Sequence, residues 1–446
     1  MTRTDVPYHL SRELLLHGIL IFILLIIGWI PFNAPGDIIK WIIILVTSGL
    51  VYLLLILKIG KIEWNKRTAI FVFIIAAVFR LAAIPLNPVL SDDVYRNIWD
   101  GRVETKGINP YKYTPLDASI YHLRDDDIWK KINHPDYRTI YPPAAQIFSW
   151  ASVKTSQIFS IDELISWKIW IFIVEMFGGY ILYLGLKNAG RASFIIVYLW
   201  CPLSIVELYV SGHVDGIGIG FLAMSIGAVL LHRKLLAGFC FITSVWTKLL
   251  SLPAIVGYLL LNDKSRLLIG GILGLLWIIP YIDSGRYSIE SLNRYEGSWE
   301  FNGVLHRALK IDDISYAIRE KLSDRNDINP KMVGRICVAS LAIFAGLFVA
   351  FFSKSFEITA LWTLGSFILL QPTIYPWYIL WLLPFLALFP VKGFIVWISL
   401  IPLSYEVLYT QALTGEWKEN HIIQWLIIAP VIIVIIFEYI KTKTNQ

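Results

Sequence analysis

The stretch IIKWIIILVTSGLVYLLLILK, residues 38–58, decides the fold class of this chain. At about 1.5 Å per residue, a helix of this length crosses the ~30 Å hydrocarbon layer of a membrane. Another apolar run precedes it at residues 13–31, and a third follows at 69–87. No small-residue cleavage site follows the first run, so we expect it to be retained as a helix rather than removed as a signal peptide. The pattern predicts an all-α integral membrane protein.

The composition of the whole chain points to the same class. Of its 446 residues, 57% are hydrophobic and only 16% are charged, and the mean hydropathy is +0.63. A water-soluble protein of this size rarely has so few charges. The apolar runs together predict a multi-span helical bundle of about 13–14 transmembrane helices. Basic residues cluster in the links that this count places in the cytoplasm, together with both termini, in agreement with the positive-inside rule.

We expect the chain to form a single polytopic membrane domain over residues 1–446. Its predicted parts are an N-terminal helical hairpin (1–67), a large first external loop with interfacial helices (88–160) and a second external loop (285–332). Residues 144–160 are only moderately apolar and predict an amphipathic helix at the membrane surface. Residues 251–262 would make only ~18 Å of helix, which predicts a half-span or a broken helix.

Charge and cysteine content exclude two other classes of protein. The formal net charge is +6, but the basic residues lie mostly between apolar runs, so we expect a lipid bilayer and no nucleic acid as a partner. Cys201, Cys240 and Cys337 lie in apolar segments without metal-ligand spacing. Neither a disulfide framework nor a zinc site is predicted, and no metal-ligating residues are assigned.

The first external loop opens LSDDVYRNIWDGRVETKGINPYKY, residues 90–113, directly after an apolar span. Adjacent carboxylates raise each other's pKa, so Asp92 and Asp93 are candidates for a general base. They could equally ligate a divalent ion through oxygen. The structural alternative is that Ser91 caps a helix whose first turn contains both acids.

A helix over residues 92–103 would place Asp93, Arg96 and Asp100 on one side. Arg96 and Arg102 could then bind a phosphate with two parallel hydrogen bonds each. The alternative is ordinary pairing with nearby acids. Glycine and proline in GINPY, residues 107–111, indicate that the helix ends there.

More ionisable residues lie at the external ends of later spans. SGHVDG, residues 211–216, contains His213 and Asp215, and Lys248 precedes a break at Pro253. Ionisable groups at a membrane boundary are candidates for function because burying them is costly. A structural hydrogen bond between His213 and Asp215, and a Lys248 side chain that extends to the headgroups, are the alternatives.

These motifs resemble those of bacterial and archaeal integral-membrane mannosyltransferase-like proteins, in the C superfamily of glycosyltransferases (GT-C). The likeness covers residues 80–390, and its motifs are SDDVYRNIWDGR (91–102), GINPY (107–111), TIYPPAAQ (139–146), GHVD (212–215) and YPWY (375–378). The resemblance implies a GT-C bundle with a catalytic first external loop, and a polyprenyl-phosphate sugar donor, commonly mannose. It also implies that Asp92 or Asp93 is the catalytic carboxylate.

The predicted function is therefore an inverting glycosyl transfer to an acceptor hydroxyl, on a lipid or glycan, at the external face of a prokaryotic inner membrane. Asp93 or Asp92 would act as base. No cofactor is expected to be obligatory, although a divalent cation could take part. The alternative function is secondary transport along a polar intramembrane pathway. The residues expected to bind donor phosphate or substrate are Arg96, Arg102, His213, Asp215, Lys248, Tyr141, Tyr375 and Trp377.

Overall fold

The computed structural model describes residues 12–30, 34–262, 264–285, 300–322 and 330–444. The model is 77% helical, and the described residues contain no strand. This confirms the all-α prediction. Parts of the predicted hairpin at 1–67 and of the predicted second external loop at 285–332 lie outside the described residues.

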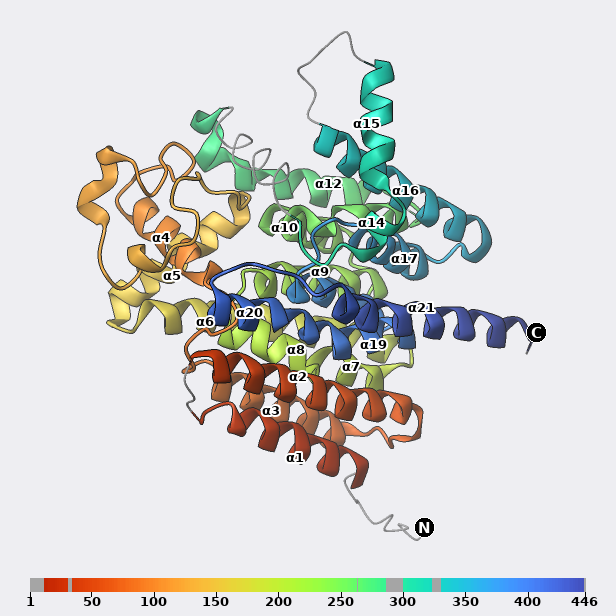
Figure 1. The fold of residues 1–446 in the computed structure, drawn as a ribbon. Coiled ribbons are helices and arrows are strands. Elements are labelled where there is room, and N and C mark those ends of the chain that lie inside the picture. Colours follow the sequence, from red (N-terminus) through yellow and green to blue (C-terminus); the bar gives the residue numbers. More distant parts are fainter. Residues whose placement is uncertain (1–11, 31–33, 263, 286–299, 323–329, 445–446) are drawn as a thin grey trace.

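The helices vary widely in length (Figure 1). In chain order the α-helices are α1 (Arg12–Ile27), α2 (Ala34–Leu57), α3 (Lys66–Ala83), α4 (Asp93–Thr105), α5 (Pro143–Phe159), α6 (Glu163–Asn188), α7 (Ile195–Leu199), α8 (Pro202–Ile205), α9 (Asp215–Leu230), α10 (Lys234–Thr247), α11 (Ile255–Tyr258), α12 (Lys264–Gly274), α14 (Val304–Ala308), α15 (Ile311–Leu322), α16 (Pro330–Ser353), α17 (Phe356–Leu369), α18 (Leu383–Leu386), α19 (Lys392–Leu400), α20 (Glu406–Thr414) and α21 (His421–Thr444).

Several helices are long and apolar enough to cross a membrane. Among the described residues these are Gly36–Leu57, Glu163–Asn188, Lys264–Ser284, Lys331–Ser353, Lys392–Thr414 and His421–Lys441. They make this a multi-pass membrane protein. A seventh span results if two consecutive segments bent by 50° are counted together. The predicted number of 13–14 included shorter runs, such as those of α9 and α10, with 16 and 14 residues, and stays a prediction.

The bent span consists of Ala192–Leu199 and Pro202–Val210. It breaks at Pro202, whose ring cannot continue the preceding helix. Arg80 of α3 holds the end of the first half, because its Nη1 donates to the carbonyl oxygen of Leu199 at 2.8 Å. The second half ends in a π-helical turn, η5 (Val206–Val210). This break leads the chain directly to the SGHVDG motif.

The N-terminal helices pack against the C-terminal part of the chain. In Figure 1, α1, α2 and α3 lie side by side as one layer of the bundle. The close approach of α2 to α19 requires Gly49, because a Cβ there would lie 2.8 Å from the Cα of Ser399. The hydroxyl of Ser399 also donates to the carbonyl oxygen of Gly49 at 2.9 Å. Long-range packing therefore places α2 and α20 beside the candidate site described below.

The segment 88–160, predicted to be the first external loop, contains two packed helices, as expected. Helix α4 corresponds to the predicted helix at 92–103, and α5 to that at 144–160. Their close crossing depends on Gly101, since a Cβ there would lie 2.3 Å from the carbonyl oxygen of Ser149. At 251–262 the helix is broken, as predicted, into a 3-10 segment η6 (Leu249–Ala254) and the single turn α11.

Candidate active site

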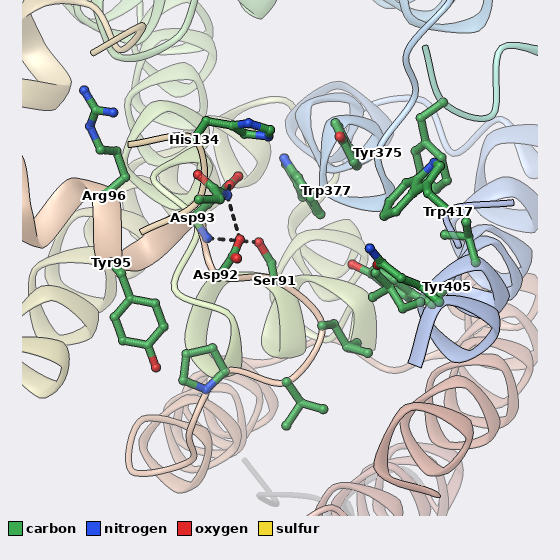
Figure 2. A pocket seen from close by; sticks show the side chains of 18 of the residues that line it. Ser91, Asp92, Asp93, Tyr95, Arg96, His134, Tyr375, Trp377, Tyr405 and Trp417 are labelled. Carbon is green, nitrogen blue, oxygen red and sulfur yellow. Dashed lines mark hydrogen bonds between the residues drawn. The ribbon is translucent and has the colours of Figure 1, made fainter. Parts of the chain in front are cut away.

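A cavity of about 700 Å³ lies between the N-terminus of α4, the loop that follows α4, and helix α20 (Figure 2). One part of its wall is polar and charged, a second part is aromatic and a third is aliphatic. The lining residues are Ile38, Pro88, Val89, Leu90, Ser91, Asp92, Asp93, Tyr95, Arg96, Asn133, His134, Tyr137, Arg138, Ile140, Tyr141, Lys248, Phe301, Tyr375, Trp377, Tyr378, Tyr405, Val407, Leu408, Gln411, Ala412 and Trp417.

Asp92 and Asp93 lie on the polar wall, at the start of α4 (Figure 2). The helix cap is Asp92, and the hydroxyl of Ser91 accepts a hydrogen bond from the backbone N–H of Asp93 at 3.3 Å. The side-chain amide of Asn133 donates to Asp92 Oδ1 at 2.6 Å and to Asp93 Oδ1 at 2.9 Å. Capping and the shared amide together hold both carboxyl groups at the cavity.

The two carboxyl groups differ in their electrostatic surroundings. Burial, and to a lesser degree the neighbouring Asp92, raises the pKa of Asp93 to about 6, although Asn133 and Lys248 act in the opposite direction. Burial also raises the pKa of Asp92. An acid whose pKa is close to neutral can both accept and release a proton, as a general base must. Asp93 therefore has the properties of a base.

His213 lies behind Asp93, in the turn between η5 and α9. Gly212 allows this turn because its φ is +74°, and a Cβ there would also lie 2.9 Å from Val94 of α4. The indole N–H of Trp167 donates to the carbonyl oxygen of Gly212 at 2.7 Å. The imidazole of His213 stacks on Trp377 with ring centroids 3.7 Å apart, and its Nδ1 lies 3.7 Å from Asp93 Oδ2. The imidazole therefore contacts Asp93, whereas the alternative was a hydrogen bond to Asp215.

Asp215 instead binds Lys248. Lys248 is the C-cap of α10, and its ammonium donates to both carboxylate oxygens of Asp215 at 3.0 Å. The indole N–H of Trp381 donates to Asp215 Oδ1 at 2.6 Å. The ammonium also lies 4.4 Å from the ring centroid of Tyr378. Asp215 is fully buried behind the cavity, whereas Lys248 reaches its wall.

The aromatic wall is a series of ring contacts. Tyr375 and Trp377 are stacked, with centroids 4.5 Å apart and an interplanar angle of 8°. Phe301 lies 5.0 Å from Tyr375 and 5.6 Å from Trp417. Backbone hydrogen bonds hold Phe301 against the chain at 372–374. Aromatic faces of this kind can stack on a sugar or an isoprenoid.

The predicted phosphate ligands on α4 have different positions. Arg96 lines the cavity, where its Nε binds Asp100 Oδ1 at 2.9 Å and its Nη1 donates to the carbonyl oxygen of Tyr137 at 2.9 Å. Its Nη2 is buried and has no hydrogen-bond partner among the described residues. Arg102 does not line the cavity, and its guanidinium binds Asp125 and Glu163. The structure therefore brings Arg96, but not Arg102, to the carboxylates.

Sequence analysis identified Tyr141, Tyr375 and Trp377, which all line the cavity, but missed other residues that do. Asn133, Tyr405 and Trp417 were not assigned to the site. The one signal available for Asn133 is the polar, proline-containing stretch INHPD, residues 132–136, around it. Nothing in the local pattern of the other two residues distinguishes them from interfacial aromatics.

Within the part of the chain that the structure describes, no group of three or more His, Cys, Asp or Glu side chains is arranged to hold a metal ion.

Comparison with known proteins identifies the family. Residues 24–262, more than half of the chain, match the family described as alpha-(1->6)-mannopyranosyltransferase, N-terminal domain. No curated protein and no solved structure matches the chain. The match includes α4, the SGHVDG motif and Lys248, and it confirms the predicted mannosyltransferase-like GT-C resemblance. It also identifies the protein as an enzyme, a glycosyltransferase, rather than a transporter. The chain therefore belongs to the alpha-(1->6)-mannopyranosyltransferase family.

Proposed function

We propose that the protein transfers mannose from a polyprenyl-phosphate donor to a hydroxyl group of a lipid or glycan acceptor, with inversion at the sugar. The observation that carries this proposal is one cavity in which two carboxylates, a lysine and an aliphatic wall occur together. The carboxylates suit the base, the lysine suits the leaving phosphate, and the aliphatic wall suits the lipid tail.

The aliphatic wall suits an isoprenoid chain. Helix α2, the link before α4, and helix α20 contribute Ile38, Val89, Leu90, Val407 and Leu408. Each CH₂ group that such a wall removes from water contributes about 0.8 kcal/mol. A polyprenyl tail placed here would have its phosphate end near the start of α4.

Two cationic groups suit the phosphate. An ammonium has three N–H donors, and Asp215 accepts two of those of Lys248. The unpartnered Nη2 of Arg96 is a further donor beside the cavity. A donor with one phosphate has less negative charge to neutralise than a nucleotide sugar. We therefore propose that no divalent cation is obligatory, and we expect turnover to be undiminished in a chelator.

The chemical step is a single displacement. Asp93 takes the proton from the acceptor hydroxyl while the oxygen of that hydroxyl forms a bond to C1 of mannose. The bond between C1 and the phosphate oxygen breaks, and its electron pair leaves with the phosphate beside Lys248. Asp92 contributes negative charge that keeps Asp93 basic. The positive-inside distribution of basic links supports an active site outside the cytoplasm, in a prokaryotic inner membrane.

The test is transfer of radiolabelled mannose from polyprenyl-phosphate mannose into membrane extracts. It compares wild type with Asp93→Asn, Asp92→Asn and a control, Asp126→Asn. Asp126 lies in the same loop, 80% exposed, and pairs only with Lys130 in the ion pairs described. Because a general base contributes roughly 10²- to 10⁴-fold, we expect Asp93→Asn to lose about 1000-fold or more of the rate.

The control and Asp92→Asn sharpen the result. Asp126→Asn should transfer mannose like wild type, and Asp92→Asn should retain more activity than Asp93→Asn. Full activity of well-folded Asp93→Asn would contradict the assignment of the base. Absence of transfer by wild type, with transfer from a nucleotide-linked mannose instead, would contradict the donor class.

A further inference from the structure

Glu207 is a fully buried carboxyl group that the mechanism above does not use. It lies in the π-helical turn η5, six residues before His213, and the backbone N–H of His213 donates to its carbonyl oxygen at 3.1 Å. Such π-helical turns occur frequently at functional sites. The side chain of Glu207 is not among the residues that line the cavity. Any effect of Glu207 on the reaction must therefore pass through a neighbour.

The neighbour is the imidazole of His213, which lies between two carboxyl groups. Its Nδ1 is 3.7 Å from Asp93 Oδ2, and its Nε2 is 3.5 Å from Glu207 Oε2. Both Nε2 and this Oε2 are buried without a hydrogen-bond partner among the described residues. The two distances exceed the roughly 2.7–3.2 Å of a hydrogen bond. Catalytic hydrogen bonds are often this long before substrate binds and shorten in the complex.

The other contacts fix which atoms can pair. The hydroxyl of Tyr405 donates to Glu207 Oε1 at 2.6 Å, while Oε2 faces Nε2 of His213 at 3.5 Å, and Ser211 acts on the same carboxyl group. Stacking on Trp377 fixes the plane of the imidazole. A neutral imidazole has a proton on only one nitrogen. The group that faces Nε2 therefore decides whether Nδ1 presents an N–H or a lone pair to Asp93.

We propose that Glu207 is a positioning residue. Its carboxylic O–H donates a hydrogen bond to Nε2 of His213, so the imidazole proton lies on Nδ1 and Nδ1–H donates to the carboxylate of Asp93. Glu207 is buried beside a tyrosine and a neutral imidazole, without a cation. The protonated, neutral form of a carboxyl group has the lower free energy in such surroundings, because burying an unpaired charge is costly. The donated N–H stabilises the ionised form of Asp93 and fixes one of its oxygens. This inference rests on the proposed function, in which Asp93 is the base.

The chain of contacts requires no additional reactant. During transfer the acceptor proton goes to Asp93, and Nδ1–H and the Glu207 proton stay where they are. After the product leaves, Asp93 returns its proton to water in the cavity. Its ionisation depends on the titratable and charged groups that face it, which are Asp92, His213, Lys248, Asp215, Glu207 and Tyr405, while His134 acts on it through Asp92.

The experiment compares Glu207→Gln with Glu207→Met, two side chains of similar length. The amide of Gln can donate to Nε2 while its oxygen accepts from Tyr405, whereas Met can do neither. We expect Glu207→Gln to remain within about threefold of wild type. We expect Glu207→Met to lower kcat roughly 10- to 100-fold, the effect of losing one hydrogen bond to a charged group, with KM for the lipid donor unchanged.

The pH profile separates this role from a merely structural one. Removal of a donor raises the pKa of a carboxylate. The acid limb of kcat/KM should therefore move to higher pH by about one unit in Glu207→Met and remain in place in Glu207→Gln. Arg80→Met/Glu175→Gln serves as a control, since it removes a buried carboxylate together with its cation, and Glu175 contacts Arg80 and Tyr209 rather than His213. Its acid limb should stay at the wild-type pH.

A second measurement needs no turnover. Nitrogen-15 NMR of histidine-labelled protein reports the tautomer, and the signal of His213 among the eight histidines is assigned by difference with His213→Asn. We expect Nδ1–H in wild type and Glu207→Gln, and loss of that preference in Glu207→Met or Glu207→Leu. A wild-type Nε2–H tautomer, or a Gln variant as impaired as the Met variant, would overturn the inference. If wild type transfers no mannose, the proposed function is wrong, but the tautomer of His213 still shows whether Glu207 orients the imidazole.

Discussion

The Arg80–Glu175 pair and the Lys248–Asp215 pair differ in what surrounds the cation. Arg80 is fully buried, and its Nε and Nη2 donate to the two oxygens of Glu175 at 2.7 and 3.0 Å. Its Nη1 donates to two carbonyl oxygens, and the hydroxyl of Tyr209 donates a further hydrogen bond to Glu175 Oε2. Every polar atom in this pair therefore has a partner within the protein.

In the Lys248–Asp215 pair, the carboxylate has all its hydrogen-bond partners within the protein, whereas the ammonium also faces the cavity. Asp215 is buried, but the side chain of Lys248 is 20% exposed at the cavity wall. A buried pair with complete hydrogen bonding holds helices in place, whereas a cation held by a buried carboxylate beside a cavity can also bind an anion. The two pairs therefore differ in the environment of the cation, and Lys248 rather than Arg80 is placed where it could contact a bound anion.

The largest effect is expected from Arg80→Met. This change leaves the carboxylate of Glu175 buried without a cation, and removal of one partner from a buried pair costs about 3–5 kcal/mol. The folded fraction in detergent and the thermal unfolding temperature measure it. The double variant Arg80→Met/Glu175→Gln removes both charges and should recover most of the lost stability. A double variant as unstable as the single one would mean that Arg80 acts through its carbonyl contacts instead.

The second largest effect is expected from the charge-matched double variant Lys248→Met/Asp215→Asn. No buried charge remains unpaired, so the protein should fold. Loss of the cation from the cavity should nevertheless lower kcat/KM for the lipid donor by roughly 100-fold, or about 2.7 kcal/mol of transition-state stabilisation. The rate of mannose transfer at matched amounts of folded protein measures it. Wild-type kcat/KM in this variant would remove the difference between the two pairs.

Local sequence patterns were sufficient to predict helices α4 and α5 and several residues that line the cavity. Glycine and proline at residues 107–110 follow a helix that begins at Asp93, and the adjacent acids at its start, singled out as candidates, line the cavity. The SGHVDG motif marked His213 as a candidate for function, and the structure places its imidazole 3.7 Å from Asp93 in a turn at Gly212. These features depend on neighbours in the chain, and sequence reasoning therefore found them.

Features that depend on long-range packing were not found. Asn133 bridges Asp92 and Asp93 from 40 residues away in an irregular loop. Arg102 has the residue type and position of a phosphate ligand, but acids from two other segments bind it. Its neighbour on the same helix, Arg96, reaches the cavity. No periodicity in the sequence distinguishes these two outcomes, because they are decided by which segments fold against α4.

The smallest effect is expected from Trp381→Phe, which tests whether Asp215 must itself be held in place. The change removes the N–H that donates to Asp215 Oδ1 at 2.6 Å. One hydrogen bond to a carboxylate that keeps its cation should alter kcat/KM for the donor by roughly two- to tenfold. Trp397→Phe is the matched control, because Trp397 is equally buried and its Nε1 has no hydrogen-bond partner among the described residues. Both variants lose the same volume, so any difference between them in transfer rate reports the hydrogen bond. Equal rates would show that the two hydrogen bonds from Lys248 are sufficient to position Asp215. The Lys248–Asp215 pair would then need fewer hydrogen bonds to keep its geometry than the Arg80–Glu175 pair has.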